Sequence, residues 1–198
     1  MSSMASHVAL LRGINVGGRN KVPMAQLREV VTSLGHTGVA TYIQSGNVLF
    51  STPETDTARL ASALQEAISE EFGLAVSVVV LSRDQLAGVL ARNPYPDEPK
   101  PQYVHVVFLG SEPTRDLLDR IKAAEGAAAA KGSRDTVTAA SDALFLHTPD
   151  GFGTSELAQT LFRIISPPAK QKKQPDLAAT ARNWATATKL LSLCEEGQ

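Results

Sequence analysis

The chain has 198 residues, of which 43% are hydrophobic and 20% are charged, and its formal net charge is −1. These values are ordinary for a globular protein with one large domain or two small ones. No run of about 18 apolar residues is present, which excludes a membrane-spanning helix, and the first residues lack the basic and apolar pattern of a secretion signal. A single cysteine, Cys194, excludes an internal disulfide and a cysteine-cluster metal site. We therefore expect a cytoplasmic protein.

The first half of the chain has the pattern of alternating strands and helices. Apolar spacing and turn residues predict, in order, a buried strand at 7–11, a helix at 24–34, hairpin strands at 39–44 and 48–50, a helix through 60–68 and a strand at 75–81. Ser82 and Gln85 have the spacing of a capping box, which predicts a further short helix.

The second half partly repeats this order after a proline-rich stretch. The predicted elements are a strand at 103–109, a helix through 117–121, strands at 136–140 and 143–147, and a helix at 157–165. The alanine run at 127–130 favours helix, but Gly126 and Gly132 on either side oppose it. An exposed loop is predicted at 166–175, and a terminal helix begins with Thr180 as its cap.

The repeated β-α-β-β-α order predicts an α+β fold with two ferredoxin-like (split βαβ) subdomains in tandem and an extra C-terminal helix. We expect an N-terminal ferredoxin-like subdomain at 1–93, a proline-rich linker at 94–102, and a second α+β subdomain with the terminal helix at 103–198. The linker follows from four prolines in nine residues, which exclude a helix or a central strand there.

Positive charge is concentrated at the two ends of the sequence. Residues 1–28 and 157–194 together hold ten of the 19 Lys and Arg but one of the 20 acids, Asp176. Such an asymmetry indicates an anion-binding face if the two ends meet in space. The alternative is two solvated basic surfaces on an otherwise acidic protein.

The first candidate binding cluster is the glycine-rich loop that follows the first strand. Glycines allow backbone amides to turn toward an anion, and basic side chains add charge. The spacing fits neither a Walker loop nor a dinucleotide fingerprint. Asn15 presents its amide to a ligand or caps its own turn, and Arg12 binds an anion or pairs with an acid. The candidate residues are Arg12, Gly13, Asn15, Gly17 and Gly18.

Two further clusters complete the predicted site. The hairpin turn contributes Gln44, Ser45 and Asn47, although a tight turn needs such residues for backbone reasons alone. The predicted terminal helix contributes Arg182, Asn183, Thr186 and Lys189, of which Arg182, Thr186 and Lys189 have the spacing of one helix face. Asp176 is the alternative partner of Arg182.

Three motifs together resemble the bacterial domain-of-unknown-function family sixteen-ninety-seven. They are Leu-Leu-Arg-Gly-Ile-Asn-Val-Gly-Gly at 10–18, Thr-Tyr-Ile-Gln-Ser-Gly-Asn-Val at 41–48 and Thr-Ala-Arg-Asn-Trp at 180–184, followed by Thr186 and Lys189. The resemblance implies an α+β fold of two related subdomains in a cytoplasmic bacterial protein, and it brings no assigned activity. The chain departs from the family in having Ala185 where Asn is common, and Glu156, within 149–156, where Lys is usual.

We expect the three clusters to form a cleft that binds an anionic, phosphate-bearing small molecule or nucleotide, without a metal or other cofactor. One alternative is an enzyme that stabilises a phosphoryl or acyl intermediate electrostatically, although no cluster contains a carboxylate. Another is an RNA-binding module, against which stand the 5% aromatic content and the lack of an RNP signature. The four histidines are scattered singly and fit no metal-binding motif. The sequence does not define the oligomeric state.

Overall fold

The computed structural model describes residues 5–166 and 177–196. The chain divides into two compact units, of which the first comprises Met1–Leu90 with Thr188–Gln198 and the second Ala91–Ala187. The last residues of the chain, which the sequence assigns to the second subdomain, therefore belong to the first unit. The segment predicted as a linker, 94–102, belongs entirely to the second unit.

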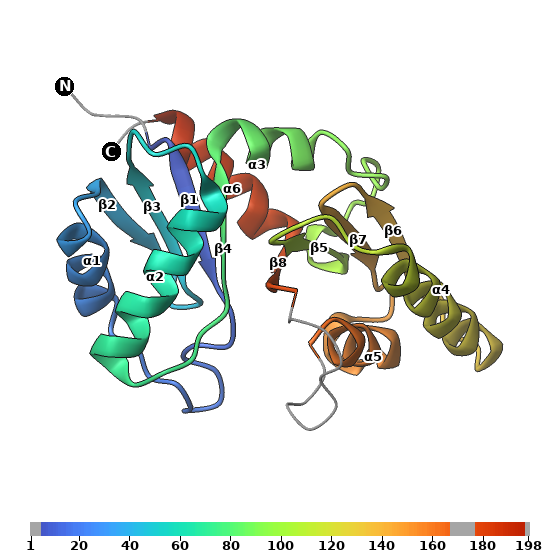
Figure 1. Cartoon of the computed structure of the whole chain (residues 1–198). Coiled ribbons are helices and arrows are strands. Elements are labelled where there is room, and N and C mark those ends of the chain that lie inside the picture. The colour runs from blue at the N-terminus through green and yellow to red at the C-terminus, as the bar shows by residue number, and fades with distance from the viewer. Residues whose placement is uncertain (1–4, 167–176, 197–198) are drawn as a thin grey trace. The chain divides into compact units, whose positions relative to one another are not determined.

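The first unit has the order βαββαβ followed by a short helix. Its sheet is antiparallel throughout, with the strand order β2-β3-β1-β4 that two interleaved split βαβ motifs produce. Its elements are β1 (His7–Leu11), α1 (Met24–Ser33), β2 (Thr37–Tyr42), β3 (Asn47–Ser51), α2 (Thr57–Phe72), β4 (Val78–Ser82) and α3 (Arg83–Leu90) (Figure 1).

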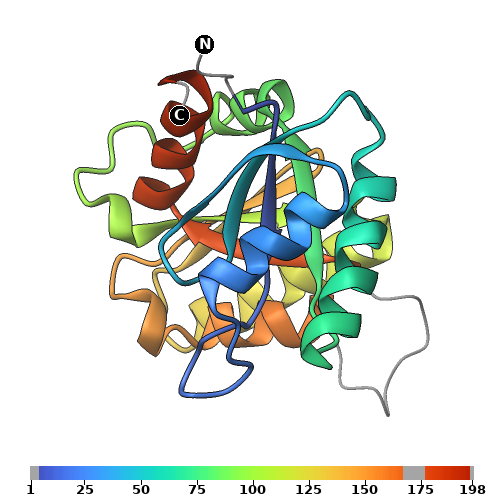
Figure 2. The same ribbon diagram turned by 90° about the vertical axis from the view of Figure 1, so that its left-hand side faces the viewer.

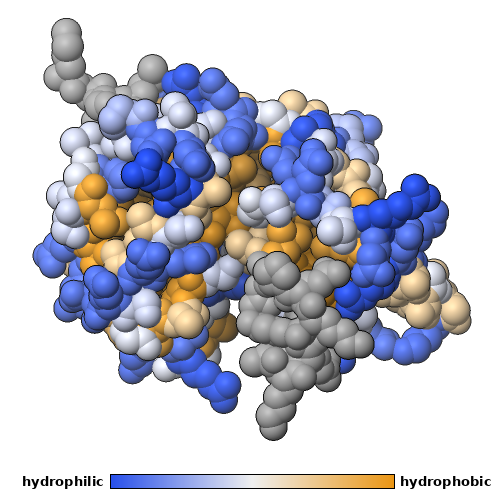
Figure 3. Space-filling view, in the orientation of Figure 1, coloured by the Kyte–Doolittle hydropathy of each residue, from blue (hydrophilic) through white to orange (hydrophobic). Residues whose placement is uncertain are grey.

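Helices α1 and α2 lie side by side over one face of this sheet (Figure 2). Because side chains alternate along a strand, every second residue of β1 and β3 points into the core beneath them. Ala9 and Leu11 of β1 and Val48 and Phe50 of β3 are fully buried there, and the helices contribute Leu27, Val31, Leu64 and Ile68. Figure 3 shows the outer surface over these helices as largely hydrophilic, with scattered apolar residues.

The second unit repeats the same order and the same sheet topology. The strand order is β6-β7-β5-β8, again antiparallel throughout. Its elements are η1 (Pro101–Tyr103), β5 (Val104–Leu109), α4 (Arg115–Ala130), β6 (Thr136–Ala140), β7 (Ala143–His147), η2 (Phe152–Thr154), α5 (Glu156–Ile165) and β8 (Ala179–Asn183). The alanine run at 127–130 is the last turn of α4 (Figure 1). The prediction of two tandem ferredoxin-like subdomains is confirmed.

The terminal helix differs from its prediction at its start. Residues 179–183 form the edge strand β8, which pairs with β5, and α6 (Trp184–Glu196) begins only after it. Thr180 is therefore a strand residue and not a helix cap. Asn183 caps α6 instead, because its Oδ1 accepts a hydrogen bond from the Thr186 amide at 2.8 Å. The predicted loop at 166–175 lies, except for Ser166, outside the described residues.

Most helices begin with a side-chain cap. Asp56 caps α2, Thr114 caps α4 and Ser155 caps α5, and Ser82 with Gln85 forms the predicted capping box before α3. Helix α1 is different, because it follows Pro23, which makes no side-chain cap, and its first turn contains no acidic residue. Within residues 5–166 and 177–196, no helix is both long and apolar enough to cross a membrane.

Candidate functional site

The loop at 12–22 folds back on itself through left-handed backbone conformations. Gly13, Gly17 and Gly18 have φ values of 69°, 57° and 75°, and Asn15 and Asn20 have φ values of 54° and 48°. The Asn15 amide donates to the Asn20 carbonyl at 3.0 Å, and the Asn20 side chain donates to the Gly13 carbonyl at 2.9 Å. The glycines are thus placed where a side chain would be strained.

The side chain of Asn15 holds the end of this loop. Its Oδ1 accepts from the Val22 amide at 2.9 Å, and its Nδ2 donates to the carbonyls of Val22 at 2.9 Å and Gln44 at 3.0 Å. Of the two readings of Asn15, these contacts favour the structural one, since the side-chain amide is occupied by backbone groups.

The hairpin turn between β2 and β3 is built around a buried asparagine. Asn47 is fully buried, and its Nδ2 donates to the Tyr42 carbonyl at 2.9 Å and to Ser45 Oγ at 3.1 Å. Ile43 and Gly46 have φ values of 49° and 86°. The backbone requirements of the turn therefore account for Asn47 and Gly46, while Gln44 remains exposed.

The structure brings the loop and the turn together, although the sequence presents them as separate clusters. The Leu11 amide donates to the Gly46 carbonyl at 2.8 Å, and Asn15 bridges to Gln44. A Cβ at Gly46 would lie 2.7 Å from Leu11 Cβ and 2.9 Å from Ile14 Cδ1. Only glycine allows this approach, so the loop and the turn pack as one body.

The outer side of the loop is open and cationic. Arg19 and Lys21 are exposed, and neither forms an ion pair among the described residues. A Cβ built at Gly13, Gly17 or Gly18 would meet no atom within 4 Å. In Figure 2 the loop, in dark blue, projects beyond the start of α1 at the bottom of the view.

The third predicted cluster does not form one helix face. Arg182 and Asn183 lie in β8, where neighbouring side chains point to opposite faces of the sheet, and Thr186 lies in the first turn of α6. Lys189 lies further along α6, 3.8 Å from Glu196. The proposed neutralising partner Asp176 lies outside the described residues.

Arg182 is buried rather than presented to solvent, with 8% of its surface exposed. Its Nη1 donates to Thr180 Oγ1 at 2.7 Å and to the Ala181 carbonyl at 2.8 Å. Burial lowers the pKa of the Arg182 guanidinium to about 10, because desolvation disfavours its charged form. These contacts give Arg182 a structural role in the second unit.

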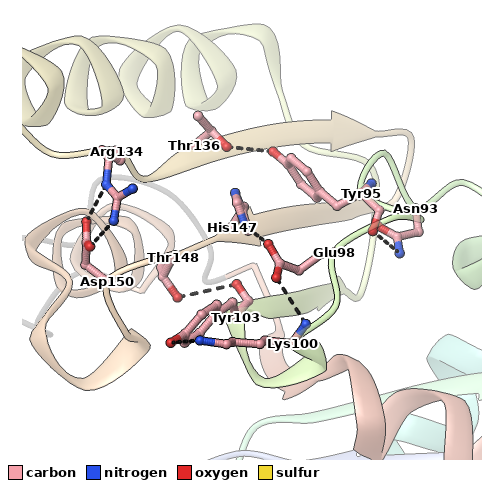
Figure 4. Close-up of polar contacts among 10 residues, drawn as sticks. All are labelled: Asn93, Tyr95, Glu98, Lys100, Tyr103, Arg134, Thr136, His147, Thr148 and Asp150. Atoms are coloured by element: carbon pink, nitrogen blue, oxygen red, sulfur yellow. Dashed lines mark hydrogen bonds and ion pairs between the residues drawn. The ribbon is translucent and has the colours of Figure 1, made fainter.

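A polar cluster in the second unit was not predicted as a site. Glu98 Oε2 lies 2.7 Å from His147 Nε2, and the Tyr95 ring stacks on the His147 ring with 4.8 Å between centroids. Figure 4 shows the Tyr95 hydroxyl turned toward Thr136, at 2.7 Å. Thr136 and His147 pair across β6 and β7 on the face opposite the α4–α5 core. The proline-rich segment therefore lies against this sheet face.

The carboxylate of Glu98 is held by two donors. Hydrogen bonds from the His147 ring and from the Lys100 amide, the latter at 3.1 Å, lower the pKa of Glu98 below its usual value. The pairing joins positions 49 residues apart, and both side chains are largely shielded, with exposures of 19% for His147 and 16% for Glu98. No local spacing in the sequence indicates this contact.

Residues 149–156, which contain the family departure at Glu156, are fastened to the end of α4 and the residues after it. Arg134 pairs with Asp150 (Figure 4). Lys131 Nζ lies 2.5 Å from Glu156 Oε1. A lysine at position 156 would face Lys131 instead. Glu156 thus has a partner within its own unit.

The remaining histidines are packed against aromatic rings. Burial lowers the pKa of His105 to about 4, and its ring stacks on Phe152 with centroids 3.9 Å apart. His7 and His36 both contact Phe50, and burial lowers the pKa of each. Among the described residues, no group of three or more His, Cys, Asp or Glu is placed to hold a metal ion.

The fold and the glycine loop together define a class of small α+β proteins built from two ferredoxin-like units. A family model described as "Protein of unknown function (DUF1697)" matches residues 4–145, and the chain belongs to this family. It is also similar to a solved structure, that of the conserved bacterial protein SP0830 from Streptococcus pneumoniae. That match has 23% identity and a TM-score of 0.67, and it covers 97% of this chain and 99% of the other. No curated protein matches the chain.

Proposed function

We propose that this protein binds an anionic, phosphate-bearing small molecule at the loop 12–22 and the start of α1. The observation that carries the proposal is the exposed pair Arg19 and Lys21, without an ion pair among the described residues, beside three glycines with open space around them. Backbone amides of such a loop and two cations make this part of the first unit electropositive and suited to an anion.

The beginning of α1 adds to this electropositive site. The first amides of a helix lack intrahelical partners, and here neither a side-chain cap nor an acid in the first turn satisfies them. The loop contains no carboxylate or imidazole that could transfer a proton, which favours binding over the enzymatic alternative. The proposal rests on the first unit alone and does not require Arg182, Asn183 or Thr186.

A titration of the full chain with inorganic pyrophosphate tests the proposal. We expect saturable binding that weakens with rising salt, and a loss of affinity of about tenfold or more in the double variant Arg19→Ala/Lys21→Ala. The matched control is Arg115→Ala/Lys122→Ala, which removes the same charges from the exposed surface of α4 and leaves affinity unchanged.

Equal affinity in the two double variants, or an absence of pyrophosphate binding by the native chain, would contradict the proposal. The RNA-binding alternative has its own outcome in this experiment. A single-stranded RNA oligomer that binds equally well to the native chain and to the Arg19→Ala/Lys21→Ala variant, and that pyrophosphate does not displace, would support that alternative instead.

A further inference from the structure

We infer that the ligand of the first unit is a nucleoside phosphate, whose base contacts Val16 and Ile43 while its phosphate lies on the loop 12–22. This inference rests on the proposed function and names the class of ligand. Two observations support it: the positions of the exposed aliphatic residues Val16 and Ile43, and the positive charge of the segments that contain them.

Large apolar side chains are rarely exposed in this chain. Among the described residues, the large hydrophobic residues with more than a third of their surface accessible are Val16, Leu34 and Ile43, at 65%, 38% and 49%. Two of these three lie in the loop and the turn that pack together. Single exposed aliphatics are common, but both of these adjoin residues that are joined by one hydrogen bond.

The positions of Val16 and Ile43 are tied to each other through their neighbours. Asn15 Nδ2 donates to the Gln44 carbonyl at 3.0 Å, and Val16 and Ile43 are the residues next to these two. The Leu11–Gly46 hydrogen bond at 2.8 Å holds the same two segments together a few residues away. Val16 and Ile43 are therefore each one residue away in sequence from the Asn15–Gln44 hydrogen bond.

Ile43 occupies its place against its own backbone preference. Its φ of 49° lies in the left-handed region, which a β-branched residue rarely adopts. With 49% of its surface accessible, the side chain gains only part of what a core position would give to offset this strain. Core packing alone therefore does not explain an isoleucine here. Contact with an apolar part of a ligand would explain it, as strained residues are frequent at binding sites.

The charges in the loop, the turn and the neighbouring segments indicate the ligand class. Residues 1–28 and 37–51 contain Arg12, Arg19, Lys21 and Arg28 and no acid. A cationic loop beside two aliphatic side chains matches a ligand with a phosphate at one end and a flat apolar group at the other. A sugar phosphate offers only the first of these features, whereas a nucleoside phosphate offers both.

Comparing adenosine diphosphate with inorganic pyrophosphate on the full chain tests this inference. We expect the native chain to bind the nucleotide roughly tenfold more tightly, since base contact adds apolar burial. Val16→Ser/Ile43→Asn lowers nucleotide affinity roughly fivefold to tenfold and leaves pyrophosphate affinity unchanged. Asparagine tolerates the left-handed backbone at position 43. Leu34→Asn, at the third exposed aliphatic residue, is the matched control and changes neither affinity.

Equal affinities for the two probes in the native chain would overturn the inference and leave the proposed function standing. An equal loss of both affinities in Val16→Ser/Ile43→Asn would overturn it too. A native chain that fails to bind pyrophosphate overturns the proposed function as well. Binding to vesicles of phosphatidylglycerol that depends on Val16 and Ile43, without nucleotide binding, would overturn the inference in favour of a lipid surface.

Discussion

At the scale of single residues, Gly46 is a position where the fold has no room for a side chain. A Cβ there would lie 2.7 Å from Leu11 Cβ, and the φ of 86° is in the left-handed region. We expect Gly46→Ala to lower the free energy of unfolding by about 2–4 kcal/mol, from overpacking and backbone strain together. Urea denaturation of the full chain measures this change.

Gly17→Ala is the matched control for Gly46→Ala. Its φ of 57° is also left-handed, but a Cβ there meets no atom within 4 Å. This variant should lose only the strain contribution, about 1 kcal/mol. If both variants lose the same free energy of unfolding, the close contact between Gly46 and β1 does not limit the size of the residue at position 46.

Ile43 presents the opposite case, in which a substitution should stabilise the chain. Its exposed side chain and left-handed backbone mean that Ile43→Asn relieves strain and loses little buried surface. We expect the free energy of unfolding to rise by about 1 kcal/mol. A fall of similar size, measured by urea denaturation against Leu34→Asn, would show that the Ile43 side chain contributes to packing.

His105 should make the stability of the second unit depend on pH. Burial lowers its pKa from 6.5 to about 4, so between these values the unfolded chain binds a proton that the folded chain does not. Stability is therefore lost as pH falls from 6.5 to about 4, by up to about 3 kcal/mol. Monitoring the His105 ring protons by NMR gives the pKa directly, and a midpoint near 6.5 would contradict the expectation. His105→Phe should lack this pH-dependent loss.

At the scale of elements, the sequence predicts most helices and strands because local chemistry determines them. The capping box of Ser82 and Gln85 forms as predicted, and so do the strands at 136–140 and 143–147. Strand β8 could not be predicted in this way. Its sequence, Ala-Thr-Ala-Arg-Asn, has only Thr180 as a strand-favouring residue, and the segment is extended because it pairs with β5.

The proline-rich segment also acquires its structure from contacts distant in sequence. Glu98 Oε1 accepts a hydrogen bond from the Lys100 amide, and Glu98 Oε2 lies 2.7 Å from His147 Nε2. In Glu98→Ala both contacts disappear, and we expect hydrogen exchange of the Lys100 amide to accelerate about tenfold. Tyr95→Phe, which removes only the hydroxyl bonds to Thr136 and Thr138, is the control and should leave that amide protected. Unchanged exchange in Glu98→Ala would mean that Glu98 does not hold the segment.

At the scale of the whole molecule, the duplication of the ferredoxin-like order is readable from the sequence because each unit has its own periodic core. The candidate site is only partly readable. The loop at 12–22 and the turn at 44–47 are visible in the sequence as polar and glycine-containing motifs. Their packing against each other depends on the Leu11–Gly46 contact, which no local pattern encodes. Arg182 is a second example. Its spacing from Thr186 in the sequence predicts a shared, exposed helix face, but Arg182 lies in β8 and is buried.

Cys194 lies in the part of α6 that belongs to the first unit. Residues 188–196 belong to this unit, and Leu190 and Cys194 are fully buried. Burial raises the pKa of the Cys194 thiol from 9.0 to about 11, which lowers its thiolate fraction at pH 8 about a hundredfold. A thiol reagent should therefore label the native chain at least about a hundredfold more slowly than the urea-unfolded chain.

Leu190→Ala removes a buried side chain from the same helix and should accelerate native labelling, because the end of α6 then separates from the first unit more often. Ser192→Ala removes a hydroxyl that donates a hydrogen bond to Glu196 on the outside of the helix, so this variant is the control and should leave the rate unchanged. If the native and unfolded chains react at the same rate, the terminal helix does not complete the first unit. The fragment 1–90 would then be as stable alone as it is within the full chain.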